Sequence, residues 1–141
     1  MHSALLVLRW TVHAFTHTQV AGSAPAFTST ATLVSPSDPS GIHVGTAVTV
    51  LATYALLPGT GPLASGIADF EVYAVTPSGQ DSKVNQQYTQ TSFSPSQSVQ
   101  SFAYTWTPSS AGTFAVMLGV FDGQWATDFH WNGSALTLNV T

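Results

Sequence analysis

The amino-acid sequence predicts an all-β protein, folded as an antiparallel β-sandwich of about seven strands. Apolar residues recur at every second position in several short runs, which is the period of a strand with one buried face. Clusters of Gly, Pro, Ser and Asp separate these runs at roughly the 8–12 residue spacing typical of a sandwich. No stretch has a convincing helical period, because Gly or Pro interrupts every candidate helix.

Each alternating run is an expected strand, and the segments between the runs are rich in turn-forming residues. The expected strands are 27–34, 46–56, 68–75, 83–90, 99–108, 113–121 and 135–140. The letters TPSGQ at 76–80 form a turn of the Pro-x-Gly kind and predict a hairpin between the third and fourth strands. Four inward aromatic side chains, each burying on the order of 150–250 Å², are expected to supply much of the core: Phe70, Phe102, Trp106 and Phe114.

A chain of 141 residues has the length of one domain, which we expect to span residues 27–141. Residues 1–26 are expected to be an N-terminal extension or linker, able to add an edge strand. The apolar run at 4–8 is short and ends at Arg9, which disfavours a signal peptide and falls well below the ~18 apolar residues of a membrane-spanning helix. His13 and His17 lie four residues apart without a third ligand nearby, so no metal site is expected there.

The charge composition excludes several classes of partner. Charged residues make up 6% of the chain, compared with about 25% in typical domains. Arg9 and Lys83 are the only Lys or Arg residues, so a phosphate-binding stripe for nucleic acid or for an anionic membrane is not expected. The surface must consist largely of Ser, Thr, Asn, Gln and Gly, which favours a secreted or extracellular protein. No cysteine is present, which excludes disulfides and thiolate chemistry.

The segment between the last two expected strands is rich in aromatic residues and is the candidate ligand-binding loop, from Asp122 to Asn132. An indole face stacks on the apolar face of a pyranose, while polar neighbours hydrogen-bond the sugar hydroxyls and fix its orientation. The candidate binding residues are Trp125, Trp131, Phe129, His130, Asp122, Gln124, Asp128 and Asn132. The alternative is that some of these rings plug the end of the sandwich. Of the two tryptophans, Trp125 is expected to be the more exposed.

Carboxylates offer little support for catalysis. Asp69 and Glu71 share one face of a strand at ~7 Å, and glycoside hydrolysis generally needs two carboxylates. That face is expected to be flat and solvated, however, which leaves them as surface charges rather than catalytic groups. No nucleophile elbow or Ser–His–Asp order is present. We therefore expect no catalytic residues and no cofactor, with structural calcium at Asp122 and Asp128 as a minor alternative.

Three segments together resemble a known kind of module. The letters FEVYAVTPSG, then YTWTPSSAGTFAVMLGVFDGQW, then HWNGSALTLNV are similar to the small Ig-like or fibronectin-III-like modules of secreted bacterial glycoside hydrolases. The resemblance covers roughly residues 28–141. Phe114 replaces the tyrosine that follows Ala-Gly-Thr in that pattern, and Gly133 replaces the second asparagine after Trp131. The resemblance implies a non-catalytic carbohydrate-binding or spacer module with an Ig-like fold.

Together these observations predict a secreted, non-catalytic module that binds a neutral polysaccharide of the cellulose, β-glucan or xylan type by aromatic stacking. Its expected partners are that polysaccharide and an attached or associated glycoside hydrolase, whose local concentration on the substrate it would raise. The alternative is a structural Ig-like spacer or a subunit of an extracellular assembly. In that case residues 1–26 would pair along the open edge strand of a neighbour.

Overall fold

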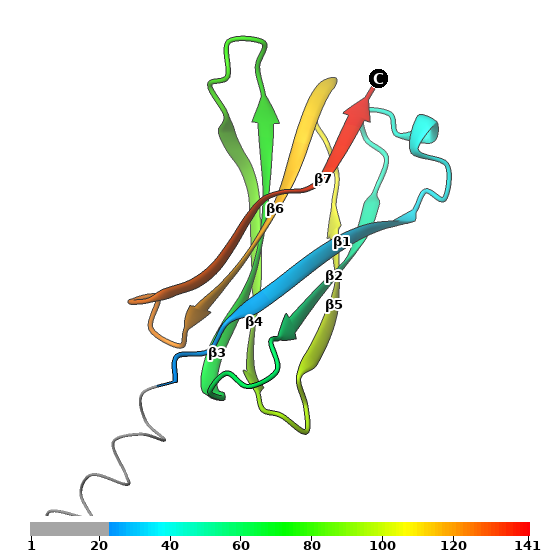
Figure 1. The fold of residues 1–141 in the computed structure, drawn as a ribbon. Helices are drawn as coiled ribbons and strands as arrows, with labels where there is room; N and C mark the ends of the chain where they lie inside the picture. The colour runs from blue at the N-terminus through cyan, green and yellow to red at the C-terminus, as the bar shows by residue number, and fades with distance from the viewer. Residues whose placement is uncertain (1–22) are drawn as a thin grey trace, which may run out of the picture.

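The computed structural model describes residues 23–141, which form seven strands and one short 3₁₀ helix (Figure 1). The elements are β1 (Phe27–Ser35), η1 (Pro39–Gly41), β2 (Val48–Leu56), β3 (Leu63–Val75), β4 (Ser82–Phe93), β5 (Val99–Trp106), β6 (Gly112–Asp122) and β7 (Asp128–Val140). The prediction of an all-β fold with seven strands is confirmed. The expected extension at 1–26 lies almost entirely outside the described residues, and its role stays a prediction.

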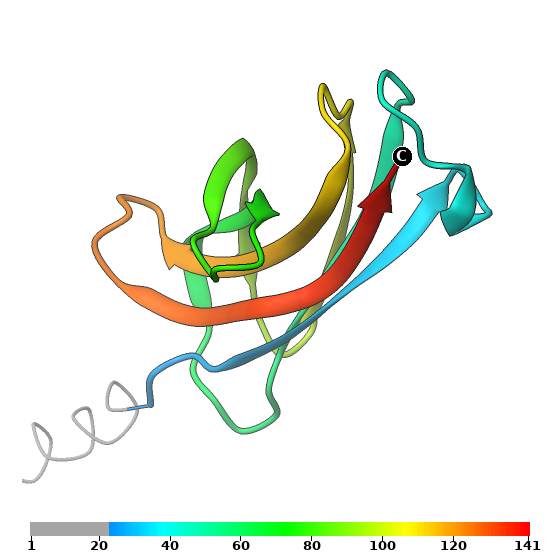
Figure 2. The ribbon, with the colours of Figure 1, turned by 90° about the horizontal axis from the view of Figure 1, so that it is seen from above.

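The strands form two antiparallel sheets that face each other as an Ig-like β-sandwich (Figure 2). One sheet has the order β1-β2-β5 and the other the order β4-β3-β6-β7. The expected hairpin joins β3 to β4, and Gly79 in its turn adopts a φ of 79°, a left-handed conformation that glycine reaches without strain. Within residues 23–141, no helix has the length and apolar character needed to cross a bilayer.

The core lies between the sheets and is built from alternate residues of the strands, as the period of two requires. Ring pairs bridge the two sheets: Phe70 stacks on Tyr104 at 4.8 Å between centroids, and Trp106 contacts Phe114 at 4.9 Å. The expected core positions of Phe70, Trp106 and Phe114 are confirmed, since each is at least nine-tenths buried. Phe102 is only half-buried and packs at the border of the core.

The outer face of the three-stranded sheet is neutral. Strands β1, β2 and β5 contain no charged residue. Hydroxyl groups pair across its strands instead, Thr49 with Thr105 at 3.0 Å and Thr53 with Ser101 at 2.9 Å. The chemically varied side chains of the domain therefore lie on the opposite face, which belongs to the four-stranded sheet.

Candidate functional site

A tight turn joins β6 to β7, at the lower left of Figure 1, and this turn contains Trp125. The Asp122 side chain accepts hydrogen bonds from the backbone N–H of Ala126 and of Thr127, and its carbonyl accepts from Trp125. Trp125 has a φ of 60°, a left-handed conformation that costs a residue with a side chain on the order of 1–3 kcal/mol. The turn therefore fixes the backbone of Trp125 in one strained conformation, and the residue is 40% exposed.

Trp131 reaches the same face from β7, which begins at Asp128 rather than at the predicted Ala135. The predicted loop is therefore a five-residue turn followed by strand. On β6 the partner of Trp131 is Gly119, and a Cβ added to Gly119 would lie 2.8 Å from the indole. The missing side chain lets the Trp131 ring lie against the sheet while 42% of the residue stays exposed. The two tryptophans are thus almost equally exposed, contrary to the expected difference.

Two further rings join the tryptophans and complete an aromatic patch of Tyr88, Phe121, Trp125 and Trp131. Trp125 meets Tyr88 edge-on at 5.2 Å and Phe121 at 5.1 Å, and Phe121 lies 6.4 Å from Trp131. Tyr88 is 55% exposed and comes from β4, so its place beside Trp125 follows from strand pairing and is invisible in local sequence. Sequence reasoning missed it for that reason.

The patch crosses the whole four-stranded sheet. Tyr88, Asp69, Gly119 and Trp131 are successive partners in one row. Three strand spacings separate the outer two residues, which places their Cα atoms about 14 Å apart. This width suits an extended ligand rather than a small molecule in a closed pocket.

Three of the predicted binding residues lie away from this patch. Phe129 packs against the core, and His130 and Asn132 face β1 across the open side of the sandwich. His130 Nε2 lies 2.8 Å from Ser29 Oγ, and Asn132 Nδ2 donates to the Ser29 carbonyl at 3.2 Å. Because residues alternate along β7, Trp131 points outward while its two neighbours face inward. They join the two sheets, and the structure does not bring them together with the tryptophans.

The remaining predicted residues surround the turn. Gln124 and Asp128 are exposed, and Asp128 Oδ1 accepts from the backbone N–H of His130. Asp122 organises the turn from within, as its hydrogen bonds show. Among the described residues, no three His, Cys, Asp or Glu side chains cluster as metal ligands would. The minor alternative of structural calcium at Asp122 and Asp128 gains no support from this arrangement.

Two carboxyl groups are buried beside the patch, which corrects the expectation that they are solvated. Asp69 is 1% exposed and Glu71 is 6% exposed. They lie on β3, a central strand, where β4 and β6 flank them on both sides. Gln86 extends from β4 and donates to Asp69 Oδ1 at 3.0 Å, while Lys83 Nζ lies 3.1 Å from Glu71 Oε1. Long polar side chains of the neighbouring strand thus cover carboxyl groups that the β3 sequence alone places in water.

The two carboxyl groups differ in how their charge is balanced. Glu71 receives hydrogen bonds from Lys83 and from the Tyr73 hydroxyl, whereas Asp69 Oδ2 is buried and has no hydrogen-bond partner within residues 23–141. Burial raises the pKa of Asp69 to about 6, the Gln86 amide lowers it, and the Glu71 charge adds to the rise. Burial and the bond to Glu71 likewise raise the pKa of Tyr73 to about 12.

The core side of the sandwich fixes the backbone under this pair. The Tyr54 hydroxyl donates to the Asp69 carbonyl at 2.7 Å, and the Tyr104 hydroxyl donates to the Ala68 carbonyl at 3.3 Å. Burial raises the pKa of both tyrosines, and the Asp69 charge adds to the rise, so they remain neutral donors. These two hydrogen bonds from the core side therefore fix the backbone of β3 at Asp69.

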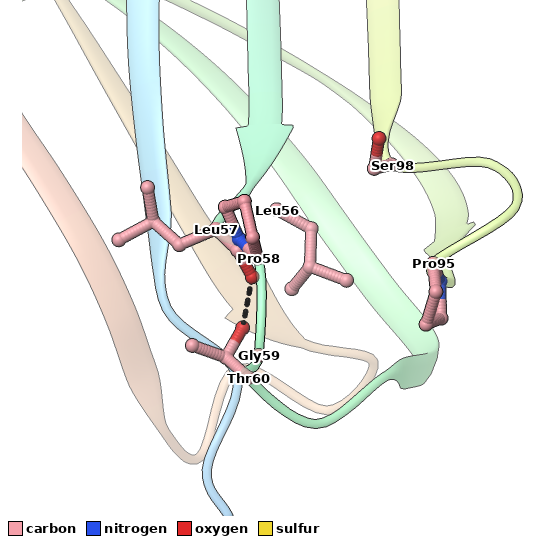
Figure 3. A pocket seen from close by; sticks show the side chains of 7 residues that line it. All are labelled: Leu56, Leu57, Pro58, Gly59, Thr60, Pro95 and Ser98. Atoms are coloured by element: carbon pink, nitrogen blue, oxygen red, sulfur yellow. Dashed lines mark hydrogen bonds between the residues drawn. The ribbon is translucent and has the colours of Figure 1, made fainter.

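A separate hollow lies between the β2–β3 and β4–β5 loops (Figure 3). It has a volume of about 240 Å³, below the ~300–1,000 Å³ of typical ligand pockets. Its walls are the aliphatic and proline side chains of Leu56, Leu57, Pro58 and Pro95, joined by Gly59, Thr60 and Ser98. The Thr60 hydroxyl is already bonded to the Leu57 carbonyl at 2.8 Å. The hollow lacks the converging polar groups of a specific site.

Comparison with known proteins supports the fold. No family model and no curated protein matches the chain. Among solved structures, the C-terminal domain of wzt matches at a TM-score of 0.63 and 11% identity, covering 84% of this chain and 75% of that one. A CARDB domain from Pyrococcus furiosus, crystallised with two metal ions, matches at 0.54 and 16% identity, covering 84% and 90%.

A third similarity is to part of a much larger protein, the β-glucosidase from Listeria innocua in complex with gluconolactone. The TM-score is 0.50 with 12% identity, and the match covers 82% of this chain but only 16% of the enzyme. At such identities the similarities establish the fold and nothing about activity. The chain is thus an Ig-like β-sandwich that shares its architecture with domains of otherwise different proteins.

Proposed function

We propose that this domain is a non-catalytic carbohydrate-binding module that attaches to a neutral polysaccharide through the aromatic patch. The observation that carries the proposal is the presence of two tryptophans, each at least 40% exposed, on one face of a sheet. Exposing an apolar indole ring to water is unfavourable, yet a rigid turn holds Trp125 at the surface and the strand that contains Gly119 makes room for Trp131 there. Such positioning reduces the entropy that a ligand must overcome on binding.

The shape of the patch indicates which form of polysaccharide it accepts. Trp125 is inclined to Phe121 by 44° and Trp131 is inclined to it by 65°, so the two indoles are not coplanar. The Tyr88 ring stands at 85° to Trp125. A flat crystalline surface needs ring faces in one plane, whereas a single flexible chain can follow rings that turn. We expect soluble chains of the β-glucan or xylan type to bind better than crystalline cellulose.

The proposal assigns no chemistry to the domain itself. Asp69 and Glu71 are buried and engaged with Gln86, Lys83 and Tyr73, which suits neither proton transfer to a glycosidic oxygen nor attack at a sugar carbon. The module would act by keeping an attached or associated glycoside hydrolase on its substrate, in a secreted setting. This role follows the resemblance of residues 28–141 to accessory modules of such enzymes.

Titration calorimetry and affinity electrophoresis with a panel of soluble polysaccharides test the proposal. Trp131→Ala and Trp125→Ala should each weaken binding at least tenfold, equivalent to about 1.4 kcal/mol. Val99→Ala removes an exposed apolar side chain from the opposite sheet and should leave binding unchanged. Both tryptophan variants should melt far closer to the parent protein than Phe114→Ala, a core truncation that costs about 3–5 kcal/mol.

Two results would contradict the proposal. One is the absence of binding to every polysaccharide of the panel. The other is a loss of stability in the tryptophan variants as large as in Phe114→Ala, which would identify the rings as core. Loss of binding in Val99→Ala as well would mean that the contact lies elsewhere.

The second candidate function is a structural spacer or assembly subunit, and the neutral outer face of the β1-β2-β5 sheet favours it. Val99 and Leu51 are exposed there without any charge that would repel a neighbour. Light scattering separates the two functions. If deletion of residues 1–22 changes the oligomeric state and no polysaccharide binds, the structural role stands and carbohydrate binding fails.

A further inference from the structure

The buried charges beside the aromatic patch do not balance. Glu71 is neutralised by Lys83, which is the one Lys or Arg among residues 23–141. Among the described residues Asp69 has no cation as an ion-pair partner, and its Oδ2 has no hydrogen-bond partner. A buried carboxylate oxygen without a partner is rare in folded proteins and costs more than the ~1–3 kcal/mol of a neutral group. A cation beside Asp69 would balance the charge that Lys83, already paired with Glu71, offsets only from a distance.

The aromatic patch surrounds the place where that cation would sit. Asp69 lies in the row between Tyr88 and Gly119, and the Trp131 ring lies over Gly119 from the far side. Aromatic faces carry a negative quadrupole and attract ammonium groups, most strongly when water is excluded. A nearby carboxylate in a low-dielectric environment adds to this attraction. The combination suits a cation held on rings.

Access to Asp69 depends on one surface side chain. Gln86 is exposed, and its amide is the only side-chain donor to Asp69 among the described residues. The Lys83 ammonium donates a hydrogen bond to the oxygen of the same amide, with Nζ 3.0 Å from Gln86 Oε1. A glutamine at the surface can change rotamer at small cost. A ligand ammonium can then take over the donor role of the Gln86 amide.

We infer that the site prefers a glycan whose sugars carry a protonated amino group, a 2-amino-2-deoxy sugar, over the same chain in neutral form. This inference rests on the proposed function, because stacking on the patch brings the sugar ring to the row that contains Asp69. Stacking alone accepts a neutral chain. The uncompensated carboxylate adds the preference for the amine.

The test compares two ligands by titration calorimetry at pH 6.5 in low salt, one with a protonated amine and the other with a neutral acetamide on each sugar. These are a glucosamine hexamer and its fully N-acetylated counterpart. The parent protein should bind the amino form at least tenfold more tightly. Asp69→Asn keeps the size of the side chain, removes its charge, and should bring the two affinities to within a factor of about two.

Two variants at position 86 keep the inference testable without altering the buried pair. Gln86→Lys places a cation of the protein's own beside Asp69 and should abolish the preference. Gln86→Ala opens the carboxylate and should preserve or enlarge it. Both changes are at an exposed position, so folding is not at risk.

The outcomes distinguish this inference from the proposed function. Equal binding of both hexamers by the parent protein, or a preference that survives Asp69→Asn, would overturn the inference and leave polysaccharide binding intact. If neither hexamer nor any neutral polysaccharide binds, both fail together.

Discussion

Replacing Asp69 with asparagine should stabilise the unliganded domain at neutral pH, although it removes a carboxylate from a candidate site. The carboxyl group is 1% exposed, and asparagine matches its shape. The asparagine oxygen can still accept from Gln86, and its amide can donate to Glu71. The variant therefore resembles the protonated form of Asp69, the form that burial favours.

The magnitude follows from the pKa of Asp69. Burial raises it from 3.8 to about 6, a difference worth about 3 kcal/mol at 1.36 kcal/mol for each pKa unit. The folded protein holds this proton more tightly than the unfolded chain does. The stabilisation is fully present below about pH 4 and is lost as the pH rises through about 6. Asp69→Asn escapes this loss, so its advantage at pH 7.5 should approach 3 kcal/mol.

Urea unfolding followed by tryptophan fluorescence at several pH values measures this difference, since Trp106 is buried in the core. The variant and the parent protein should be equally stable at pH 3.5 and should diverge between pH 4 and 7. Taking the difference between variants cancels the titration of the groups that the Asp69 charge does not influence. Asp81→Asn, a change at an exposed carboxylate, serves as the control and should leave the curve unchanged.

A variant that is less stable than the parent protein at pH 7.5 would refute the reasoning. So would a constant difference at all pH values, because it would arise from packing rather than from a proton. Either result would mean that the folded state accommodates the Asp69 charge, and it would weaken the case for a cation beside Asp69.

Two further predictions concern the positions that frame the patch. Gly119→Ala should weaken polysaccharide binding at least tenfold, because the added Cβ would lie 2.8 Å from the Trp131 ring and displace it. Gly133→Ala is the matched control, since its added Cβ would have no atom closer than 3.6 Å. Equal binding by both variants would contradict the placement of Trp131. His130 should titrate below 6.5 in an NMR experiment, since burial lowers its pKa against the opposing effect of Asp128. The contribution of neutral His130 to stability is then present above pH 6.5 and is lost as the pH falls. His130→Gln should remove this loss of stability at low pH. An NMR titration midpoint above pH 6.5 would show that burial does not dominate the pKa of His130.

The strands are predictable from the sequence, because a strand with one buried face has apolar residues at every second position. The alternation of Phe114, Val116 and Leu118 is visible without any knowledge of partners. The start of β7 was misplaced, because its first residues include Trp131, Asn132 and Gly133, a composition typical of turns. Pairing with β6, including the bulge that follows Asn132, keeps that segment extended.

The candidate site was predictable in part. Both tryptophans were identified from their place near a turn, but the face to which each ring points depends on where the strand begins. Misplacing the start of β7 by seven residues left the sides of His130 and Trp131 undetermined. The burial of Asp69 was also beyond local sequence, because the covering Gln86 lies seventeen positions away on another strand.

Opposite charges meet at one place in the part of the chain that the structure describes, the pair of Lys83 and Glu71. Apolar packing and the threonine pairs of the β1-β2-β5 sheet carry the rest of the fold, and dissolved ions do not screen these interactions. Ionic strength therefore has little influence on the framework, whereas it acts directly on a cation drawn to Asp69. A response of ligand binding to salt thus reports mainly on the attraction of the ligand to Asp69.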